Sequence, residues 1–592
     1  MTNFANGMSR TFTRGRLAVA LALAIGMQGL MVAPAAHGAD AAAWAATRTQ
    51  VPDTADAAFN GYAADQELVS ITVALKLRNK DVLDSYTQEL FHPGPSYHQF
   101  LTSQESAANF APTQQQAQAV ADYLTQQGFT HVQIAPNRLL VTADGTVGAA
   151  RSAFHTEVGH FTRNGHSGIA NTSDVQVPAT LSGQVDQVLG LQTLHQAHTF
   201  SLPASQLRPA YTVVSVTGNS SAHAYYPQEF ATVYDAGSTA VATKTTVAII
   251  GWGSMTNAVN DLTQFESGQK VTAVPTSIVS TTTKSSSDDS GQGEWGMDAQ
   301  AIVGVSGGVQ KLIFYTDGGT YSSTNGSSGA SNSGLLQVIN KAVSDNTAKV
   351  INMSWGEPEC DGAPGFADSA LQLGVTQGQT FSAATGDNGS YPCPLNGSAP
   401  ENGAYGSKTT LSVNYPASSP YVVAAGGTTL STSTSDVYTS EASWPYSGGG
   451  ISGSEATPSW QSSSYPHREV PDVAFDADWT NSPIIVYFTK SSTSGISQSG
   501  YYTNGGTSLA SPLFVGSWAR LETANNNGLG FAAPALYAYA SSFPFHDVTT
   551  GNNGYYSATT GRDNATGWGS FDIQAASTFI GATPGFITAT NP

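Results

Sequence analysis

The chain has 592 residues, 40% hydrophobic and 10% aromatic, so its composition excludes a disordered protein and its length exceeds that of one domain. Only 11% of the residues are charged, and the net charge at pH 7 is -19. Such an acidic chain repels phosphates, and we expect it to bind neither nucleic acid nor an anionic membrane surface. Few Lys and Arg remain to repel one another once the carboxylates are protonated. The composition therefore fits an acid-tolerant protein as well as an ordinary secreted one.

The first 38 residues have the pattern of an export signal. Three arginines precede an apolar run over residues 17–32, and the small residues of "APAAHGAD" follow it. Glycines and Gln28 interrupt the apolar run, which favours a cleaved signal over a retained membrane helix. We predict a signal peptide at residues 1–38, a secreted, extracellular protein and no membrane anchor.

A small α+β domain is predicted for residues 39–200. "ELVSITVALKL" alternates like a half-buried strand and "TQQQAQAVADYLTQQGF" is an amphipathic helix, and "NRLLVTADGT" and "TVGAARSAFHTEV" repeat this order. Residues 201–224 are rich in Ser, Thr and Asn, which predicts an exposed linker that contains a processing site.

The rest of the chain, residues 225–592, alternates short apolar strands with helical patterns. This order is typical of a buried, mainly parallel sheet with helices packed on it, in which catalytic groups gather at the carboxyl ends of the strands. The expected strands lie at 245–250, 311–316, 349–355, 379–386 and 421–427, and the expected helices at 296–305, 334–346, 367–378 and 511–527.

Ser508 in "NGGTSLASPLFVG" stands at the head of an apolar helical run, with Pro512 placed as in a first helical turn. Free backbone N–H groups and the positive end of the helix dipole would favour a developing oxyanion there. A helix-capping serine has the same pattern. A nucleophile needs a base, and none of His223, His467 or His546 has the setting of a histidine in a serine-protease motif.

Acidic residues are better candidates for the base. In "GQGEWGMDAQAIVG", Glu294 and Asp298 are four residues apart and lie on one face of a helix. Two acids at this spacing repel each other unless they share a proton, and a shared proton leaves one group able to act as a base in acid. Two solvated surface acids are the alternative, but Gly, Trp, Met and Ala surround the pair and no Lys or Arg is near.

Asp387 ends a predicted strand in "FSAATGDNGSY". It is either a structural turn aspartate or, when protonated, a hydrogen-bond donor to an oxyanion. In the C-terminal "FHDVTTGNNGYYSATTGRDNATGWGSFD", Asp547 and Asp563 are either turn residues or ligands of a hard cation. Backbone carbonyls of Val548, Thr559 and Gly561 would complete such a site. The two cysteines, Cys360 and Cys393, favour a disulfide over a metal site in an exported protein.

Several of these segments stand together in one order: "QGEWGMDAQAIVG", "SAATGDNGSY", "NYPASSPYVVAAGGTTL", "PDVAFDA", "GGTSLASPLFVGSWARL" and "HDVTTGNNGY…TGWGSFD". In this order they resemble the sedolisin family of serine-carboxyl peptidases, in particular its pseudomonalisin-like members. The similarity spans nearly all of residues 225–580, and residues 65–195 look like the activation prodomain of the family.

The resemblance implies a subtilisin-like α/β fold with a mainly parallel sheet, preceded by an α+β prodomain. It also implies that Ser508 is the nucleophile and Glu294 its general base. Asp298 would polarise Glu294, and Asp387 would form the oxyanion hole with the backbone N–H of Ser508. Such enzymes act in acid, because the Glu–Asp pair must hold a proton and Asp387 must be protonated to donate one.

The resemblance further implies one structural Ca²⁺ ion bound by Asp547, Asp563 and the carbonyls of Val548, Thr559 and Gly561. Two residues depart from the family pattern, since Thr559 stands where Gly is common and Arg562 where an aromatic residue is common. The carbonyl ligand survives only if the backbone angles of Thr559 permit a side chain, and an inward-pointing Arg562 would repel the cation. Trp355 matches a substrate-cleft segment, and Cys360–Cys393 matches a disulfide of pseudomonalisin-like members.

From the sequence we expect a secreted, monomeric, self-processing zymogen that cleaves polypeptides in acid, with its own prodomain as intramolecular inhibitor and chaperone. One alternative is a tripeptidyl-peptidase of the same family, since the sequence does not tell whether one end of the cleft is blocked. The other is a non-catalytic, calcium-binding secreted protein of this fold, which would not need all four residues Glu294, Asp298, Asp387 and Ser508.

Overall fold

The computed structural model describes residues 43–163, 165–210, 223–282, 286–317, 329–362, 364–395 and 400–586. The predicted signal peptide and residues 211–222 of the predicted linker lie outside these ranges. By its internal contacts the chain divides into Met1–Ala43 and Trp44–Pro592. The second unit contains both an N-terminal region, up to residue 210, and a C-terminal region, from residue 223.

An antiparallel sheet of four strands, in the order β4-β5-β3-β9, organises the N-terminal region. Its strands are β3 (Leu68–Leu75), β4 (Thr130–Ile134), β5 (Leu140–Thr146) and β9 (Val185–Leu189). Helices α3 (Gln114–Gln126) and α4 (Val147–Phe154) pack on it, and a capping box at Thr113 starts α3. The predicted strand–helix–strand–helix order is therefore confirmed, with the extra strand β4 between α3 and β5.

The two faces of β3 contact different parts of the molecule. Val69, Ile71 and Val73 belong to the core of the N-terminal region, together with side chains of α3 and α4. On the opposite face Leu68 and Ser70 are exposed, but Thr72 bonds the Ser333 hydroxyl of the C-terminal region at 2.8 Å and accepts a hydrogen bond from Gln337 at 2.9 Å. A strand that reads as half-buried is thus buried on both sides from Ile71 onward.

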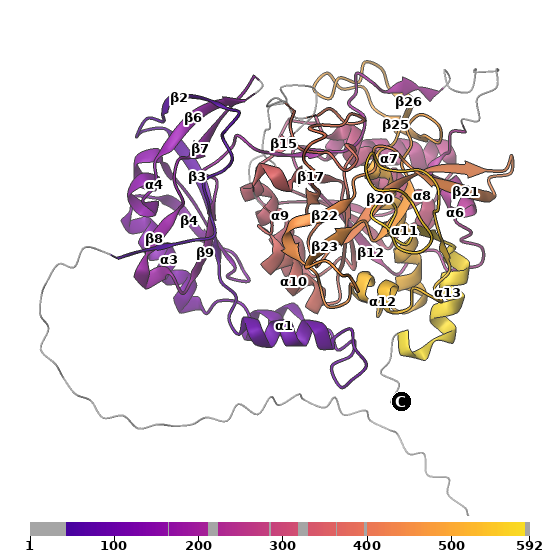
Figure 1. Ribbon diagram of the computed structural model, residues 1–592, viewed down its shortest axis with the longest axis horizontal. Helices are drawn as coiled ribbons and strands as arrows, with labels where there is room; N and C mark the ends of the chain where they lie inside the picture. The colour runs from indigo at the N-terminus through magenta and orange to yellow at the C-terminus, as the bar shows by residue number, and fades with distance from the viewer. Residues whose placement is uncertain are drawn as a thin grey trace, which may run out of the picture. The chain divides into compact units, whose positions relative to one another are not determined.

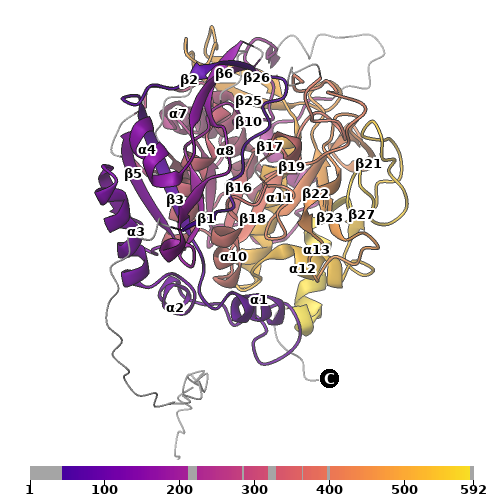
Figure 2. The same cartoon turned by 60° about the vertical axis from the view of Figure 1, so that its left-hand side comes forward.

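Smaller elements complete the N-terminal region. Further strands are β1 (Trp44–Ala46) paired with β8 (Gln176–Pro178), and a three-stranded sheet of β2 (Ala58–Tyr62), β6 (Val158–Arg163) and β7 (His166–Asn171). Helix α1 (Lys80–Glu89) lies beside α10 (Asp368–Thr376) in Figures 1 and 2, and Gln372 of α10 donates to Asp84 of α1 at 2.8 Å. Helix α2 (Ser103–Asn109) lies between α1 and α3 in the chain.

The C-terminal region is built on an eight-stranded sheet in the order β13-β14-β12-β16-β18-β20-β21, with β24 also paired to β20. All pairings are parallel except β20 with β21. The strands are β12 (Thr246–Gly251), β13 (Thr276–Ser280), β14 (Lys311–Thr316), β16 (Val350–Met353), β18 (Thr380–Ala384), β20 (Val423–Thr432), β21 (Tyr438–Ser443) and β24 (Val473–Asp476). The predicted mainly parallel sheet is confirmed.

Helices cover this sheet on both faces (Figure 1). Helices α9 (Asn332–Asp345) and α10 pack on one face, and α8 (Gln292–Ser306) and α11 (Thr507–Ala524) on the other. Helix α7 (Thr256–Gln269) packs on the outside of α8, so α8 is buried all round. Two further helices, α12 (Ala532–Ala538) and α13 (Ile573–Ala582), follow α11 in the chain.

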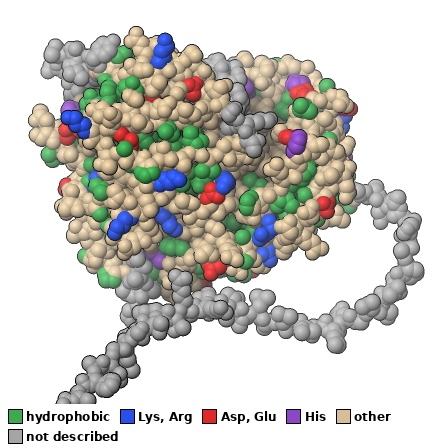
Figure 3. All heavy atoms as spheres, turned by 180° about the vertical axis from the view of Figure 1, so that it is seen from behind, with side chains coloured by type: hydrophobic (Ala, Val, Ile, Leu, Met, Phe, Trp, Pro, Cys, Tyr) green, Lys and Arg blue, Asp and Glu red, His purple; other side chains and the backbone are tan. Residues whose placement is uncertain are grey.

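Three further observations concern the cysteines, the surface and the hydropathy of the helices. Cys360 and Cys393 form a disulfide with a Cα–Cα distance of 6.0 Å, as predicted. The face seen in Figure 3 shows mostly uncharged polar side chains and backbone, with isolated acidic and basic side chains, as the low charged fraction requires. Within the described ranges, no helix is both long enough and apolar enough to cross a membrane.

Candidate active site

Ser508 is the second residue of α11 and is completely buried. The residue that caps this helix is Gly506, with φ of 98°, and no side chain accepts a hydrogen bond at the cap. The Ser508 hydroxyl instead donates to the Ser354 carbonyl oxygen at 3.3 Å, and it lies close enough to the Glu294 carboxylate to lower the pKa of that group. The helix-cap interpretation of Ser508 is therefore wrong.

Pro512 lies in the second turn of α11 and not in the first turn that the sequence predicts. Because proline has no N–H, it cannot bond the carbonyl four residues earlier, which belongs to Ser508. The Ser354 hydroxyl contacts that free carbonyl oxygen at 3.4 Å. The proline thus leaves the backbone next to Ser508 available to a neighbouring strand.

Glu294 and Asp298 both lie on α8 with exposures of 2% and 0%, so they are not solvated surface acids. Asp298 Oδ1 accepts a hydrogen bond from the Ser354 hydroxyl at 2.7 Å. Glu294 Oε1 and Asp298 Oδ2 have no hydrogen-bond partner among the described residues. Two buried acids one helical turn apart, each with a free oxygen, meet the conditions for a shared proton.

Burial dominates the electrostatics of this pair. It raises the pKa of Glu294 to about 7, although hydrogen bonds from Ser508 and Ser201 act in the opposite direction. Burial, followed by the charge of Glu294, raises the pKa of Asp298 well above its usual range. The pair therefore keeps a proton at a pH at which isolated surface carboxyls have lost theirs.

Asp387 follows β18 and is completely buried beside the start of α11. Its Oδ1 accepts hydrogen bonds from the Thr507 N–H and hydroxyl, each at 2.8 Å. Its Oδ2 has no partner within the described part of the chain, and burial raises its pKa well above the usual range. The buried position beside Ser508 does not fit an ordinary surface turn aspartate, and a neutral Asp387 can donate from Oδ2.

The polar residues that connect these acids have no distinctive sequence pattern and were not predicted. Ser354 contacts both Asp298 and Ser508, and its hydroxyl accepts a hydrogen bond from Asn352 at 2.9 Å. Ser511 in turn donates to Asn352 Oδ1 at 2.7 Å. The one available signal was position, because Asn352 and Ser354 stand at the carboxyl end of β16 in "INMSW".

Trp355, expected in a substrate-cleft segment, begins strand β17 (Trp355–Pro358). Its side chain is buried in the core and donates to the Ile250 carbonyl at 2.9 Å. Its backbone faces another segment, because β10 (Ala197–Thr199) lies antiparallel between β17 and β15 (Gly329–Ala330). The backbone of this segment, and not the tryptophan ring, borders the cleft.

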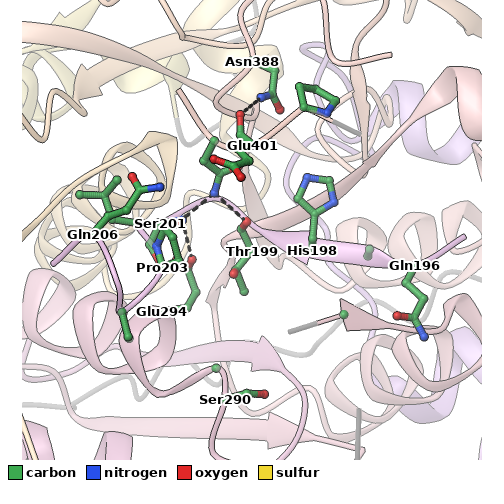
Figure 4. Close-up of a pocket in the computed structure, with 18 of the residues that line it drawn as sticks. Gln196, His198, Thr199, Ser201, Pro203, Gln206, Ser290, Glu294, Asn388 and Glu401 are labelled. Atoms are coloured by element: carbon green, nitrogen blue, oxygen red, sulfur yellow. Dashed lines mark hydrogen bonds between the residues drawn. The ribbon is translucent and has the colours of Figure 1, made fainter. Parts of the chain in front are cut away.

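The chain that follows β10 runs through the cleft next to the acids (Figure 4). Ser201 N–H donates to Glu294 Oε2 at 2.9 Å, and Leu202 N–H donates to Asn504 Oδ1 at 3.0 Å. The Asn402 side chain donates to the carbonyls of Thr199 and Ser201 at 3.1 and 3.0 Å. The sequence predicts an exposed linker from residue 201, whereas Ser201 and Leu202 are buried and Arg208–Pro209 form strand β11.

Both carboxylates that are predicted as calcium ligands contact the backbone of residues 559–561. Asp547 accepts hydrogen bonds from the Gly561 N–H at 3.0 and 3.2 Å, and Asp563 Oδ2 accepts one from the Thr559 N–H at 2.6 Å. Two carboxylates and nearby carbonyls are an all-oxygen donor set of the kind that Ca²⁺ prefers. Within the described ranges, no group of three or more His, Cys, Asp or Glu side chains is placed to hold a metal ion, so carbonyl ligands are needed.

Both departures from the family pattern are compatible with this set. Thr559 does not have a positive φ, so its backbone accepts a side chain. Arg562 does not point at the carboxylates, since its guanidinium donates to Tyr537 at 3.0 Å and Asn564 at 2.8 Å and lies 3.5 Å from Glu469. The residues therefore fit a calcium ion.

Comparison with known proteins places this site in a family. Residues 55–194 match the Pro-kumamolisin activation domain, and residues 276–569 match the Subtilase family. The chain is 42% identical to xanthomonalisin of Xanthomonas sp. (strain T-22), over 91% of this chain and 69% of that protein. It is 41% identical to sedolisin of Pseudomonas sp. (strain 101), over 87% of each.

A solved structure agrees with these relatives. Pseudomonas sedolisin, a serine-carboxyl proteinase complexed with two molecules of pseudo-iodotyrostatin, matches with a TM-score of 0.52 and 41% identity. The match covers 61% of this chain and 99% of that one. The chain belongs to the sedolisin family and is a serine-carboxyl peptidase with an N-terminal activation prodomain.

Proposed function

We propose that this enzyme is an acid-acting endopeptidase that cleaves polypeptides through an acyl-enzyme on Ser508. The observation that carries the proposal is a buried serine, Ser508, placed close enough to a buried acid, Glu294, to lower the pKa of that acid. The three acids and the serine that the sequence singled out are supplied by three elements, namely α8, the end of β18 and the start of α11.

In the proposed mechanism, Glu294 accepts the Ser508 proton as the hydroxyl attacks the substrate carbonyl carbon. Asp298 supports the transfer by sharing a proton with Glu294, which offsets the cost of moving charge onto a buried acid. Protonated Asp387 and the Ser508 N–H, which lies in the first turn of α11, donate to the oxyanion. Glu294 then protonates the leaving amine, and water hydrolyses the ester by the reverse proton path.

The requirement for acid follows from these roles. Asp387 can donate to an oxyanion only in its protonated form, and the pair needs one shared proton. In the zymogen the Ser201 segment covers the acids and burial raises their pKa values. When that segment leaves, water re-enters the cleft and the pKa values fall toward those of ordinary carboxyls, so the mature enzyme needs a lower pH.

Endopeptidase action is favoured over tripeptidyl-peptidase action by the path of the chain through the cleft. A tripeptidyl-peptidase needs a barrier that stops a substrate three residues before the cleaved bond. Here the segment preceding Ser201 continues through β10 and pairs with β15 at Ala197, four residues upstream. An open path on this side accommodates internal stretches of a long polypeptide.

One structural Ca²⁺ ion is proposed for the C-terminal loop, held by Asp547, Asp563 and the carbonyls of Val548, Thr559 and Gly561. The ion would tie two distant loop segments together and stabilise the fold without entering the reaction. Calcium at 100 times its dissociation constant should stabilise the protein by about 2.7 kcal/mol. A wild-type Tm that rises with calcium, with no such rise in Asp547→Ala, is the expected result, and equal responses would remove the proposal.

The protein is further proposed to be secreted as a monomeric zymogen, with residues 1–38 as the cleaved export signal. The prodomain would act as an intramolecular inhibitor, since its C-terminal segment already occupies the cleft. Secretion would appear as mature protein in the culture medium of the host, lacking the first 38 residues or more. A full-length chain retained in the cytoplasm would contradict it.

The central test is purification at about pH 8 followed by a shift to pH 3–4, where carboxyl groups titrate. Wild type should shed its N-terminal part and then degrade casein and a peptide with a blocked N-terminus. Ser508→Ala should remain full length under the same conditions, while Ser517→Ala, a buried serine two turns along the same helix, should process normally. Self-processing by Ser508→Ala would refute the nucleophile assignment, and a requirement for a free N-terminal amine would favour the tripeptidyl-peptidase.

A further inference from the structure

We propose that the first self-cleavage of the zymogen breaks the peptide bond between Phe200 and Ser201. This inference rests on the proposed function, since it uses the same nucleophile and base. It differs from the expectation drawn from composition, which places the processing site in the polar stretch at 201–224. Three groups of contacts locate the bond.

The first group aligns the chain before the bond. His198 pairs with Gly356 and Thr199 with Trp355 in the antiparallel ladder between β10 and β17, and Ala197 pairs with Ala330 of β15 on the other side. An antiparallel register continues one residue at a time, so Phe200 is the next residue and lies opposite Ser354. Ser354 is the residue whose carbonyl contacts the Ser508 hydroxyl at 3.3 Å. Continued by one residue, the ladder therefore sets Phe200 beside the segment that contacts the nucleophile.

The second group sets the direction of the Phe200 carbonyl. Asn402 holds the carbonyls of Thr199 and Ser201 at 3.1 and 3.0 Å. Successive carbonyls of an extended chain point to opposite sides, so the Phe200 carbonyl points away from Asn402. A β-carbon placed on Gly506 would collide with both the Phe200 oxygen and Asp387 Oδ2. The Phe200 carbonyl and the unpartnered Asp387 oxygen therefore occupy the same small space.

This close approach also explains the glycine. Gly506 has φ of 98° and immediately precedes α11, and any side chain there would displace one of the two oxygens. Two buried oxygens that face one another repel unless one of them carries a proton. A protonated Asp387 satisfies both, and the same hydrogen bond would strengthen as the carbonyl becomes an oxyanion.

The third group concerns the leaving amine. Ser201 N–H donates to Glu294 Oε2 at 2.9 Å, so the nitrogen that must gain a proton already faces the acid that would supply it (Figure 4). On the far side, Asn504 holds the Leu202 N–H at 3.0 Å. The chain is thereby fixed on both sides of one bond, with residues 197–199 in the ladder and Leu202 on Asn504.

The Phe200 ring fits the same placement. It is completely buried, and its edge lies 2.9 Å from where a β-carbon on Gly356 would stand and 3.4 Å from one on Gly386. Two glycines thus leave room for one aromatic ring. The ring anchors the register, since a shift of the chain by one residue would place Thr199 or Ser201 in an aromatic-sized space.

The cleavage step balances in atoms and in protons. Ser508 Oγ bonds to the Phe200 carbonyl carbon while its proton moves to Glu294. The Phe200–Ser201 C–N bond breaks as Glu294 passes that proton to the Ser201 nitrogen, which leaves as an amine. Water then adds to the ester, gives a proton to Glu294 and releases the Phe200 carboxylic acid, and Ser508 regains its proton. One water molecule is consumed, and no other reactant is required.

The test is a time course of the full-length zymogen moved from about pH 8 to about pH 4. Aliquots are quenched in denaturant, and the new N-termini are read by intact mass and terminal sequencing. The first product should begin at Ser201, and its rate should not change over a tenfold range of protein concentration, as expected for cleavage within one molecule. Ser201→Pro removes the N–H that bonds Glu294 and should suppress this product at least tenfold.

Ser205→Pro is the matched control, because residue 205 is exposed and follows the bond by five positions. It should process at 201 like wild type. An earliest N-terminus elsewhere, for example within 205–222, would overturn the proposal, as would a Ser201→Pro protein that yields the same first product rate as the control. Neither result touches the proposed function, which would fail only if the wild type did not process or degrade casein in acid at all.

Discussion

The N-terminal and C-terminal regions of this zymogen differ in the titratable groups that they bury or place at their contact. Eight of the 12 histidines lie between residues 92 and 198. Arg163 and His195 of the N-terminal region contact each other and Asp361 of the C-terminal region, and we call these three residues the clamp. The C-terminal region instead buries carboxyl groups whose pKa values burial has raised, among them Glu294, Asp387 and Glu522. Acidification therefore charges one region and neutralises the buried acids of the other.

Under the proposed function, this contrast would let acid weaken the contact of the prodomain without charging the interior of the peptidase region. Protonation of a buried histidine adds a charge to a contact that already contains an arginine, whereas protonation of a buried carboxyl removes a charge from a low-dielectric interior. If the contact of the prodomain depended on buried carboxyl groups instead, acidification would strengthen that contact. Substitutions in each region can test the contrast, and they differ in the size of the effect expected.

The largest effect is expected at Asp387. Asp387→Ala removes an oxyanion donor and should lower kcat by about 10²- to 10³-fold. Asp387→Asn keeps a donor that does not titrate, so it should retain more activity and lose less of it as the pH rises. Steady-state rates on a peptide substrate between pH 3 and 7 would show this. Equal losses in both variants would mean that Asp387 acts structurally and not as a donor.

The next effect concerns the stability of the C-terminal region. Burial raises the pKa of Glu522 to about 7, so the stabilisation by its neutral form is complete below its unfolded pKa of 4.5 and is lost as the pH rises through 7. The shift corresponds to roughly 3 kcal/mol. In the non-processing Ser508→Ala background, Glu522→Gln should flatten the dependence of the unfolding free energy on pH between 4.5 and 7. Denaturant melts at several pH values measure it.

Glu522 is suited to this test because it lies at the far end of α11 from Ser508 and accepts hydrogen bonds from the N–H groups of Leu529 and Gly530, each at 3.2 Å. A carboxamide oxygen can keep one of these bonds. Glu401→Gln, which changes an exposed acid, serves as the control and should leave the curve unchanged. If Glu522→Gln also left the dependence of the unfolding free energy on pH unchanged, Glu522 would not contribute to stability in acid.

A smaller effect is expected at the clamp between the regions. Arg163 donates to Asp361 at 3.1 Å and to His195 Nδ1 at 3.0 Å, and His195 Nε2 contacts the Asp53 carbonyl at 2.8 Å. Burial lowers the pKa of His195, so this contact stabilises above the unfolded pKa of 6.5 and is lost as the pH falls through the lower folded value. Protonation at Nδ1 would displace the arginine bond, and Asp361 alone would then face two cations.

Arg163→Ala should therefore raise the pH at which the prodomain separates and speed release about tenfold at pH 6, measured by loss of inhibition after cleavage. Arg151→Ala breaks ion pairs with Asp65 and Glu157 that lie wholly inside the N-terminal region, and it should leave the release unchanged. A shift of equal size in both variants would show that general loss of charge, and not the clamp, controls release.

The smallest effect separates the two stages of activity by pH. Because the bound segment buries the acids of the site, self-cleavage should extend to a higher pH than casein hydrolysis by the mature enzyme. Parallel pH profiles of zymogen processing and of peptide hydrolysis would measure the difference, expected to be about one pH unit. Superimposable profiles would mean that the segment does not alter the pKa values of the site.

Much of this molecule was predictable because its signals are local or are carried by residue type. The apolar runs predicted the parallel strands, the Cys360–Cys393 pair followed from an exported chain with two cysteines, and the acids stood out against an interior-like background. The local pattern left alternatives open where a distant group decides the outcome. Ser508 has the pattern of a helix cap, and that pattern does not show that Glu294, more than two hundred residues away, lies close to it.

By itself the sequence determined the fold class, the order of the two regions and the residue types available for acid chemistry, since periodicity and side-chain type suffice for these. Only the tertiary structure decided which backbone groups meet the acids. The Ser201 N–H and the Phe200 carbonyl are groups that every residue has, so no side-chain pattern marks them. They acquire a role only because β10 pairs with β17 and Gly506 leaves space beside Asp387.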